Sequence, residues 1–217
     1  MSAPRSLGVR RALRVLGRAA DAGVEEFEAA MAPAFRGDPA SAARWGHRLF
    51  NEAEERSRRV GDAEPACAAG CSYCCHVHVD ASRPEVLAVA SYLEASLTAD
   101  QLSAFRARLA DHVDKVDVLS DEERWGAGIP CALLDEGGRC SVHPARPFRC
   151  RAFESPSADL CRRAFEGEDV DVPRAAPRRA RALASVEEGY DRALAREGID
   201  PTPVRLEAAL LTALARP

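Results

Sequence analysis

The sequence predicts a mainly α-helical protein around a small, irregular, cysteine-rich centre with one short β-hairpin. Apolar residues recur at spacings of three and four along most of the chain, which is typical of amphipathic helices. The apolar fraction, 47% of 217 residues, is largely alanine, a strong helix former. Four of the eight cysteines fall within one short stretch, whereas large apolar residues are few there and in residues 126–162. The helices are therefore expected to surround a centre that cysteine, rather than a large apolar core, holds together.

Helix boundaries follow from capping signals. Asp38 and Pro39 suit the N-cap and first position of one helix, and Thr98 with Gln101 forms a capping box for another. Arg83-Pro84-Glu85 begins the helix between them, and a single further turn is expected at residues 120–123. The expected helices span residues 8–31, 39–60, 83–97, 99–116, 157–165, 178–197 and 204–214.

Extended structure is expected in two places. Residues 76–80 alternate with period two, which indicates a short strand. Residues 131–134 and 139–142 flank a turn with two glycines, which supplies the positive φ that a hairpin turn needs. Such a hairpin would bring Cys131 and Cys140 near each other.

Charge and hydropathy exclude several classes of protein. A net charge of −4 gives the chain no bulk attraction for nucleic acid, and no apolar run reaches the length of a membrane span. Residues 1–20 hold five arginines and no acid, and they lack the apolar run of a signal peptide, so a cytoplasmic location is expected. We interpret those arginines as a solvated helix face rather than as an arm for an acidic partner.

The cysteines indicate a metal-binding centre. Thiolates suit zinc, copper(I) and iron–sulfur clusters, and clustered cysteines in a cytosolic chain favour metal binding over disulfides. Adjacent Cys74 and Cys75 would make a strained disulfide and are poor partners at one mononuclear site. Two four-cysteine sites, one cluster with cysteines left over, and a two-metal centre with bridging sulfurs all stay open. The expected ligands are Cys67, Cys71, Cys74, Cys75, Cys131, Cys140, Cys150 and Cys161.

These cysteines and their flanking residues resemble the YkgJ-type cysteine-cluster (CxxCxxCC) family, which is described as a zinc- or iron-chelating domain. The resemblance rests on Pro130-Cys131, on Arg146-Pro147 before Cys150-Arg151, and on counterparts for all eight cysteines, and it covers about residues 65–165. Many members have two residues between the first two cysteines, where this chain has three, residues 68–70.

The resemblance implies a possible catalytic role, because the family includes relatives of flagellin lysine N-methylase, an enzyme thought to use an iron–sulfur cluster. The spacing of Cys67, Cys71 and Cys74 also matches the cluster motif of radical S-adenosylmethionine enzymes. The strand–helix barrel of those enzymes is not expected here, since the chain offers almost no strands. An iron–sulfur cluster is expected slightly ahead of zinc, with S-adenosylmethionine as an optional cofactor.

Charged residues near the cysteines are further candidates. Arg146, Arg149 and Arg151 could neutralise a thiolate cluster or clamp an anionic cofactor or substrate. The residues of unassigned role are His76, His78 and His143, any of which could be a ligand, and Asp111, His112 and Asp114, which are expected to be solvated.

Three functions therefore stay open. The first is a metal- or cluster-binding protein with a reactive centre, the second an iron–sulfur-dependent protein N-methyltransferase-like enzyme, and the third a structural-zinc module that binds a protein partner. The expected organisation is N-terminal helices over residues 1–62, a cysteine-cluster domain over 63–166, and a linker with C-terminal helices over 167–217.

Overall fold

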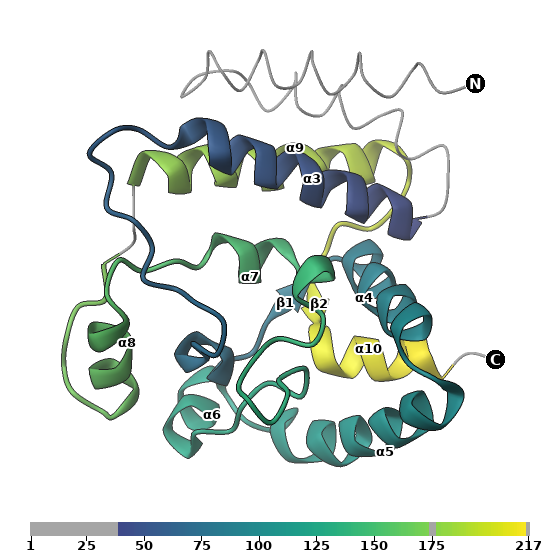
Figure 1. Cartoon of the computed structure of the whole chain (residues 1–217). Coiled ribbons are helices and arrows are strands. Elements are labelled where there is room, and N and C mark those ends of the chain that lie inside the picture. Colours follow the sequence, from purple (N-terminus) through teal and green to yellow (C-terminus); the bar gives the residue numbers. More distant parts are fainter. Residues whose placement is uncertain (1–38, 174–176, 216–217) are drawn as a thin grey trace.

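A computed structural model describes residues 39–173 and 177–215 and confirms the mainly α-helical fold (Figure 1). The helix expected at residues 8–31 and its arginines lie outside the described residues. The helices are α3 (Pro39–Ser57), α4 (Arg83–Ser96), α5 (Ala99–Val116), α6 (Asp121–Ala127), α7 (Phe148–Ala152), α8 (Ala158–Phe165), α9 (Pro177–Arg196) and α10 (Leu206–Leu214). Short elements join them: the 3-10 turns η2 (Tyr73–His76) and η3 (His143–Ala145) and the strands β1 (Asp80–Ala81) and β2 (Val204–Arg205). In the part of the chain that the structure describes, no helix has both the length and the apolar character needed to cross a membrane.

Three successive helices begin with the same reciprocal cap. A serine or threonine at the N-cap pairs with a glutamate or glutamine three residues later, so that two backbone N–H groups are satisfied at once. The pairs are Ser82–Glu85, Thr98–Gln101 and Ser120–Glu123. The expected box at Thr98 is therefore confirmed, and α4, α5 and α6 begin at positions fixed by sequence.

One helical layer is formed by α3 and α9, which lie side by side in Figure 1. Their shared core includes Leu49, Val186 and Tyr190, and Phe148 from α7 inserts into it. The Phe148 ring meets the Tyr190 ring edge-on, with ring centroids 5.1 Å apart. Gly46 on α3 allows this approach, since a Cβ atom there would lie only 3.0 Å from Cζ of Phe148. The helix that carries Cys150 is thus anchored to the α3–α9 layer.

A second layer is formed by α4, α5 and α10, with α10 packed against both other helices. Its core also takes residues from the segment between α6 and α7, including Leu133 and Val142, and Cys131 and Cys140 pack against it. The cysteine segments therefore pack on both layers, through Leu133 and Val142 on the second and through Phe148 on the first.

The only ladder among the described residues joins segments far apart in the chain. β1 pairs with β2 in antiparallel register, with Asp80 opposite Arg205 and Ala81 opposite Val204. The strand expected at residues 76–80 is therefore displaced, because His76 ends the η2 turn instead. The final helix begins at Leu206 rather than at residue 204, because Val204 is used in the ladder.

The hairpin expected at residues 131–142 is reduced to one antiparallel bridge between Leu134 and Cys140. Asp135 accepts hydrogen bonds from the backbone N–H groups of Gly137 and Arg139 and thereby closes the turn between them. The turn still brings Cys131 and Cys140 to the same place, as the sequence predicts.

Candidate metal centre

Cys131, Cys140 and Cys150, which we call the inner group, lie beside the second core. All three are half-buried free thiols. Burial raises the pKa of Cys150 to about 12, and the nearby sulfurs of Cys140 and Cys74 add to the shift. Burial likewise raises the pKa of Cys131, with further increases from Glu207 and the other two sulfurs of the group. The three thiols are thus close enough to interact.

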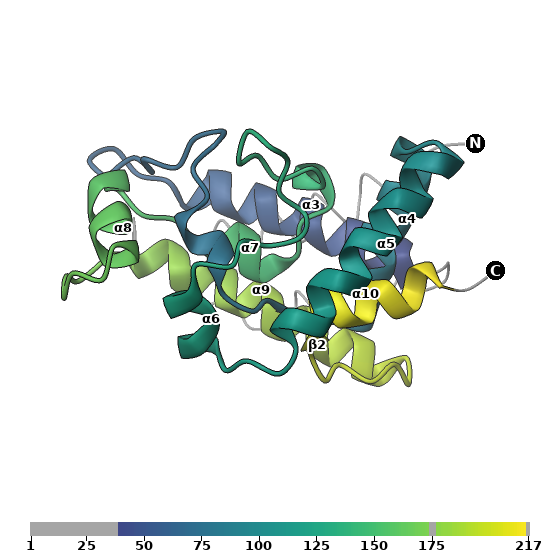
Figure 2. The same ribbon diagram turned by 90° about the horizontal axis from the view of Figure 1, so that it is seen from below.

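Cys67, Cys71 and Cys161, which we call the outer group, lie on the segment before η2 and on α8. Cys67 is the exposed cysteine, and the other two are half-buried. Burial raises the pKa of Cys71, and the sulfurs of Cys67, Cys74 and Cys161 raise it further. Cys161 comes from α8, which packs on η2 and lies at the end of the molecule opposite α10 in both views (Figures 1 and 2). The outer group therefore combines two loop cysteines with one helix cysteine from about ninety residues later.

The adjacent pair Cys74 and Cys75 connects the two groups. Cys74 interacts with Cys71 of the outer group and with Cys150 of the inner group. The backbone carbonyl of Cys75 accepts a 2.7 Å hydrogen bond from the N–H of Cys131. A hydrogen bond between the two thiols of the pair and their burial raise the pKa of Cys74. The pair thus lies between the two groups, where one of its sulfurs could complete the inner group and the other the outer group.

The extra residue between the first two cysteines is absorbed by a tight turn. The N–H of Cys71 donates to the carbonyl of Ala68 at 2.9 Å, and Gly70 takes a φ of +92°. This turn packs backbone to backbone on the glycine turn before Cys140. A Cβ atom at Gly138, whose φ is +71°, would lie 3.3 Å from the carbonyl oxygen of Gly70. Glycine is therefore needed where the two cysteine-bearing turns meet.

The donor set suits a thiophilic metal. Eight free thiols are present, and neighbouring sulfurs raise the pKa of one another because their thiolates repel. A bound cation would reverse this effect, because it favours the deprotonated ligands. Within the two described ranges, however, no three Cys, His, Asp or Glu side chains already converge tightly enough to hold a metal ion. The cysteines are thus near one another but do not form a closed metal site.

The comparison with protein families agrees with the donor set. Residues 66–171 match the family model CxxCxxCC, described as "Putative zinc- or iron-chelating domain". This match and the eight free cysteines together support metal binding by the region. No curated protein and no solved structure matches the chain.

The three candidate arginines have different surroundings. Arg151 is buried and donates to Arg146 O at 2.7 Å, to Pro144 O at 2.6 Å and to Asn51 Oδ1 at 2.9 Å, which makes it a brace between α3 and α7. Burial lowers its pKa to about 10. Arg149 is exposed and pairs with Glu187 on α9 at 3.3 Å.

Arg146 is the candidate arginine whose charge acts on the most cysteines. Its charge opposes the rise in pKa of the Cys74, Cys140 and Cys150 thiols. Its Nε atom is buried and has no hydrogen-bond partner. Arg146 is therefore the candidate best placed to neutralise thiolates or to meet an anion beside them.

Two of the three candidate histidines can be described by their ring nitrogens. His78 donates from Nε2 to Leu119 O at 3.0 Å and accepts at Nδ1 from Arg124 at 3.1 Å, so neither nitrogen is left for a metal. His76 donates from Nδ1 to Ser72 O at 3.0 Å, which leaves the Nε2 lone pair unassigned in the neutral ring. Its ring lies 4.4 Å, centroid to centroid, from Phe165 on α8. His143 is exposed in η3.

A buried ion-pair network next to the inner group was not foreseen from the sequence. Arg124, fully buried on α6, donates to both oxygens of Glu207 on α10, at 2.6 and 3.1 Å. Glu207 Oε1 also accepts from Nε2 of His112 at 2.9 Å and from the N–H of Ala132, next to Cys131, at 2.9 Å. The expectation of a solvated His112 is therefore wrong, because the histidine packs against a buried carboxylate. Burial by itself would raise the pKa of Glu207, but these hydrogen bonds hold it at about 2.

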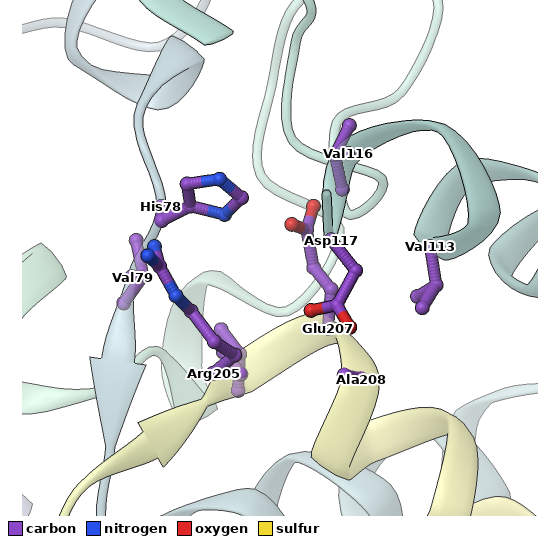
Figure 3. Close-up of a pocket in the computed structure, with 9 residues that line it drawn as sticks. His78, Val79, Val113, Val116, Asp117, Arg205, Glu207 and Ala208 are labelled. Carbon is purple, nitrogen blue, oxygen red and sulfur yellow. The ribbon is translucent and has the colours of Figure 1, made fainter. Parts of the chain in front are cut away.

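Glu207 of this network lines a small pocket between α5, β2 and α10 (Figure 3). His78, Asp117, Arg205 and Glu207 surround the space, and no cysteine is among its lining residues. The signal for the network lay in α10, where Glu207 is the single charged residue between Leu206 and Leu214.

A second buried carboxylate holds the start of α7. Glu85 Oε1 accepts from the N–H of Phe148 at 2.8 Å and meets Nε2 of His47 at 3.2 Å. Its other oxygen closes the cap of α4 by accepting from Ser82 at 2.9 Å. Burial would raise the pKa of Glu85, but the hydrogen bonds from His47 and the backbone lower it. Glu85 thereby fixes the helix that carries Cys150.

Proposed function

We propose that residues 66–171 form a metal–thiolate centre with two metal positions, one at the inner group and one at the outer group. The observation that carries this proposal is the division of the sulfurs into two interacting sets that meet at Cys74 and Cys75. Three cysteines in each set and one from the adjacent pair give four thiolates per position, the number that closes a tetrahedral zinc or an iron–sulfur site.

The inner set is the better organised of the two. Ala132 N–H is held by Glu207 and Phe148 N–H by Glu85, so two ligand segments are positioned before any metal binds. Metal binding would supply folding free energy, on the order of 10 kcal/mol for structural sites.

An iron–sulfur cluster and zinc bound by these cysteines would differ in metal content, acid-labile sulfide and absorbance. Anaerobic purification followed by metal and sulfide analysis should find about two metal positions filled per chain under this proposal. Absorbance near 400 nm with acid-labile sulfide would identify iron–sulfur, which we place slightly ahead, whereas a colourless protein with zinc would identify zinc. A folded protein with neither metal and with oxidised thiols would contradict the proposal.

The role of the metal in stability can be tested in the same preparation. Chelation, or Cys71→Ser, should loosen residues 65–82 and 126–162 while helices outside these segments stay partly formed. Ser72→Ala is a matched control at an adjacent residue that bears no thiol. If the chelated protein kept its full cooperative melt, metal would not be what holds these segments.

The methyl-transfer and protein-module functions remain predictions. The pocket of Figure 3 lies next to the buried ion pair rather than among the cysteines, so it supports neither. Of the predicted cofactor contacts, Arg146 is supported by the thiols on which its charge acts, and Arg149 and Arg151 have protein partners.

A further inference from the structure

The two cysteine groups are attached to the scaffold unequally. In the inner group, Cys131 and Cys140 pack against the apolar core and Cys150 follows the anchored Phe148. In the outer group, Cys67 is exposed and lies in a segment without regular structure, residues 58–72, that follows α3. Next to Cys67, the segment is held by one backbone bond, Ala66 N–H to Ser155 O at 2.8 Å, and by a weak contact of Cys67 Sγ with the same oxygen at 3.9 Å. Its C-terminal end packs through Gly70 on the turn at Gly138.

Exposure extends along the chain on both sides of Cys67. Residues 66–70 are all exposed, and so are residues 59–64. A long exposed segment with few backbone hydrogen bonds to the rest of the protein opens locally at small free-energy cost, whereas segments packed in a core open only with the whole domain. Cys67 can therefore move away from the outer group without disturbing the helical layers.

Resting on the two-position centre proposed above, we propose that the outer group is an exchange position, which passes its metal to and from an external thiolate, while the inner group retains its metal. Cys67 is the ligand that is displaced. The incoming thiol loses its proton and forms a metal–sulfur bond, and the metal–sulfur bond to Cys67 breaks as its thiolate takes up a proton. No electron is transferred, so the step needs no oxidant or reductant.

Cys71 and Cys161 keep the metal attached while Cys67 is away. Cys71 is held by the turn to Ala68, and Cys161 lies on α8 one helical turn before Phe165. The Phe165 ring packs between the rings of His76 and Trp125, at 4.4 and 5.4 Å between centroids. The turn thus holds Cys71 and the aromatic contacts of Phe165 hold the helix of Cys161, while Cys67 is free to leave.

The test uses the full chain, stripped and reloaded anaerobically with zinc, which any four-thiolate position accepts. Exchange against an enriched zinc isotope is followed by mass spectrometry, with and without glutathione as the external thiol. We expect two phases of similar size, the faster by at least about tenfold, a difference of about 1.4 kcal/mol in barrier. Glutathione should accelerate only the fast phase, in proportion to its concentration.

Two variants assign the phases. Cys67→Ser should weaken zinc binding at the outer group and remove the glutathione-dependent acceleration of the fast phase, whereas Cys140→Ser should remove the slow phase and lower the melting temperature. Alkylation of the zinc-loaded wild-type protein gives a measurement that does not depend on variant folding: iodoacetamide should modify Cys67 well before Cys131 or Cys150.

The outcomes separate the two proposals. A wild-type chain that takes up no zinc contradicts the metal centre itself. A chain that binds two zinc ions but exchanges them in one phase, or that protects Cys67 from alkylation as well as Cys150, retains the metal centre and overturns the exchange position.

Discussion

Replacement of Arg124 by methionine tests the buried ion pair beside the inner group. Arg124 is fully buried, and the Glu207 side chain is 8% exposed, so neither charge is solvated when its partner is removed. Breaking a buried pair typically costs about 3–5 kcal/mol. Because His112 and the N–H of Ala132 still bind Glu207, we expect the lower end, about 3 kcal/mol. For a chain of this size, that corresponds to a melting temperature lower by about 6–12 °C.

The assay is urea unfolding of the metal-loaded protein, followed by circular dichroism, on a double-mutant cycle of Arg124→Met and Glu207→Gln. The double variant should recover part of the loss, since it leaves no uncompensated buried charge. Arg205→Met is the matched control. Arg205 lines a pocket with Glu207 but is 41% exposed and pairs with exposed Asp121, so its loss should cost no more than about 1 kcal/mol. A loss below about 1 kcal/mol for Arg124→Met, or strict additivity in the cycle, would refute the reasoning.

The same pair has a pH signature. The folded pKa of Glu207 is about 2, below its ordinary value of 4.5, so the carboxylate contributes stability that is fully present above pH 4.5 and lost as the pH falls toward 2. Arg124→Met should raise that pKa and move acid unfolding to higher pH. Protonation of the thiolate ligands also lowers stability in acid, but it does so equally in Arg205→Met, so the difference between the two variants reports on Glu207.

Three further variants test other parts of the fold. Burial and the charges of neighbouring carboxylates raise the pKa of Asp191 from 3.8 to about 7, so ionisation of Asp191 is unfavourable in the folded state. Asp191→Asn should therefore stabilise the protein above pH 7 and lose this advantage as the pH falls to 4. Glu188→Gln, an exposed control on the same helix, should not show this pH-dependent gain in stability. Gly138→Ala should destabilise the protein by about 1–2 kcal/mol and weaken metal retention, because its φ of +71° disfavours a side chain and its Cβ would press on the neighbouring turn; normal stability and normal retention would contradict this. Gly46→Ala should cost about 1–3 kcal/mol in thermal unfolding through overpacking of the aromatic cluster, whereas Gly126→Ala, which meets no atom within 4 Å, should be neutral or slightly stabilising.

Local signals predicted the helices well. The capping box at Thr98, the proline after Ser82 and the apolar stripes of α4 and α5 all depend on residues within a few positions of one another. The turn that joins Cys131 to Cys140 was also predictable, because its glycines and Asp135 act over four residues. Residues that are neighbours in the sequence determine these elements, so a single sequence is enough to predict them.

Pairings across long separations were not predictable. The β1–β2 ladder joins residues more than 120 positions apart, and neither strand is long enough to show a period of its own. Arg124 and Glu207 were similarly hidden, because a charged residue on a helix is ordinarily solvated and its burial depends on a partner 83 residues away. The division of the cysteines into two groups followed the same rule, since it depends on how α7 and α8 return to the η2 turn.

The buried carboxylates explain why the inner group can be both well positioned and hard to ionise. Glu207 holds the segment of Cys131 and Glu85 holds the segment of Cys150, yet each carboxylate also raises the pKa of the thiol that it positions. Before metal binds, those thiols therefore stay protonated and hold their places. A cation that binds must displace these protons. Because the helical layers already position the ligand segments, little further conformational entropy is lost when the metal binds. No buried carboxylate of the described residues positions the exposed segment of Cys67. The conformational entropy that this segment loses therefore weakens metal binding there and favours release of the metal. The same scaffold thus predicts tight retention at the inner group and exchange at the outer one.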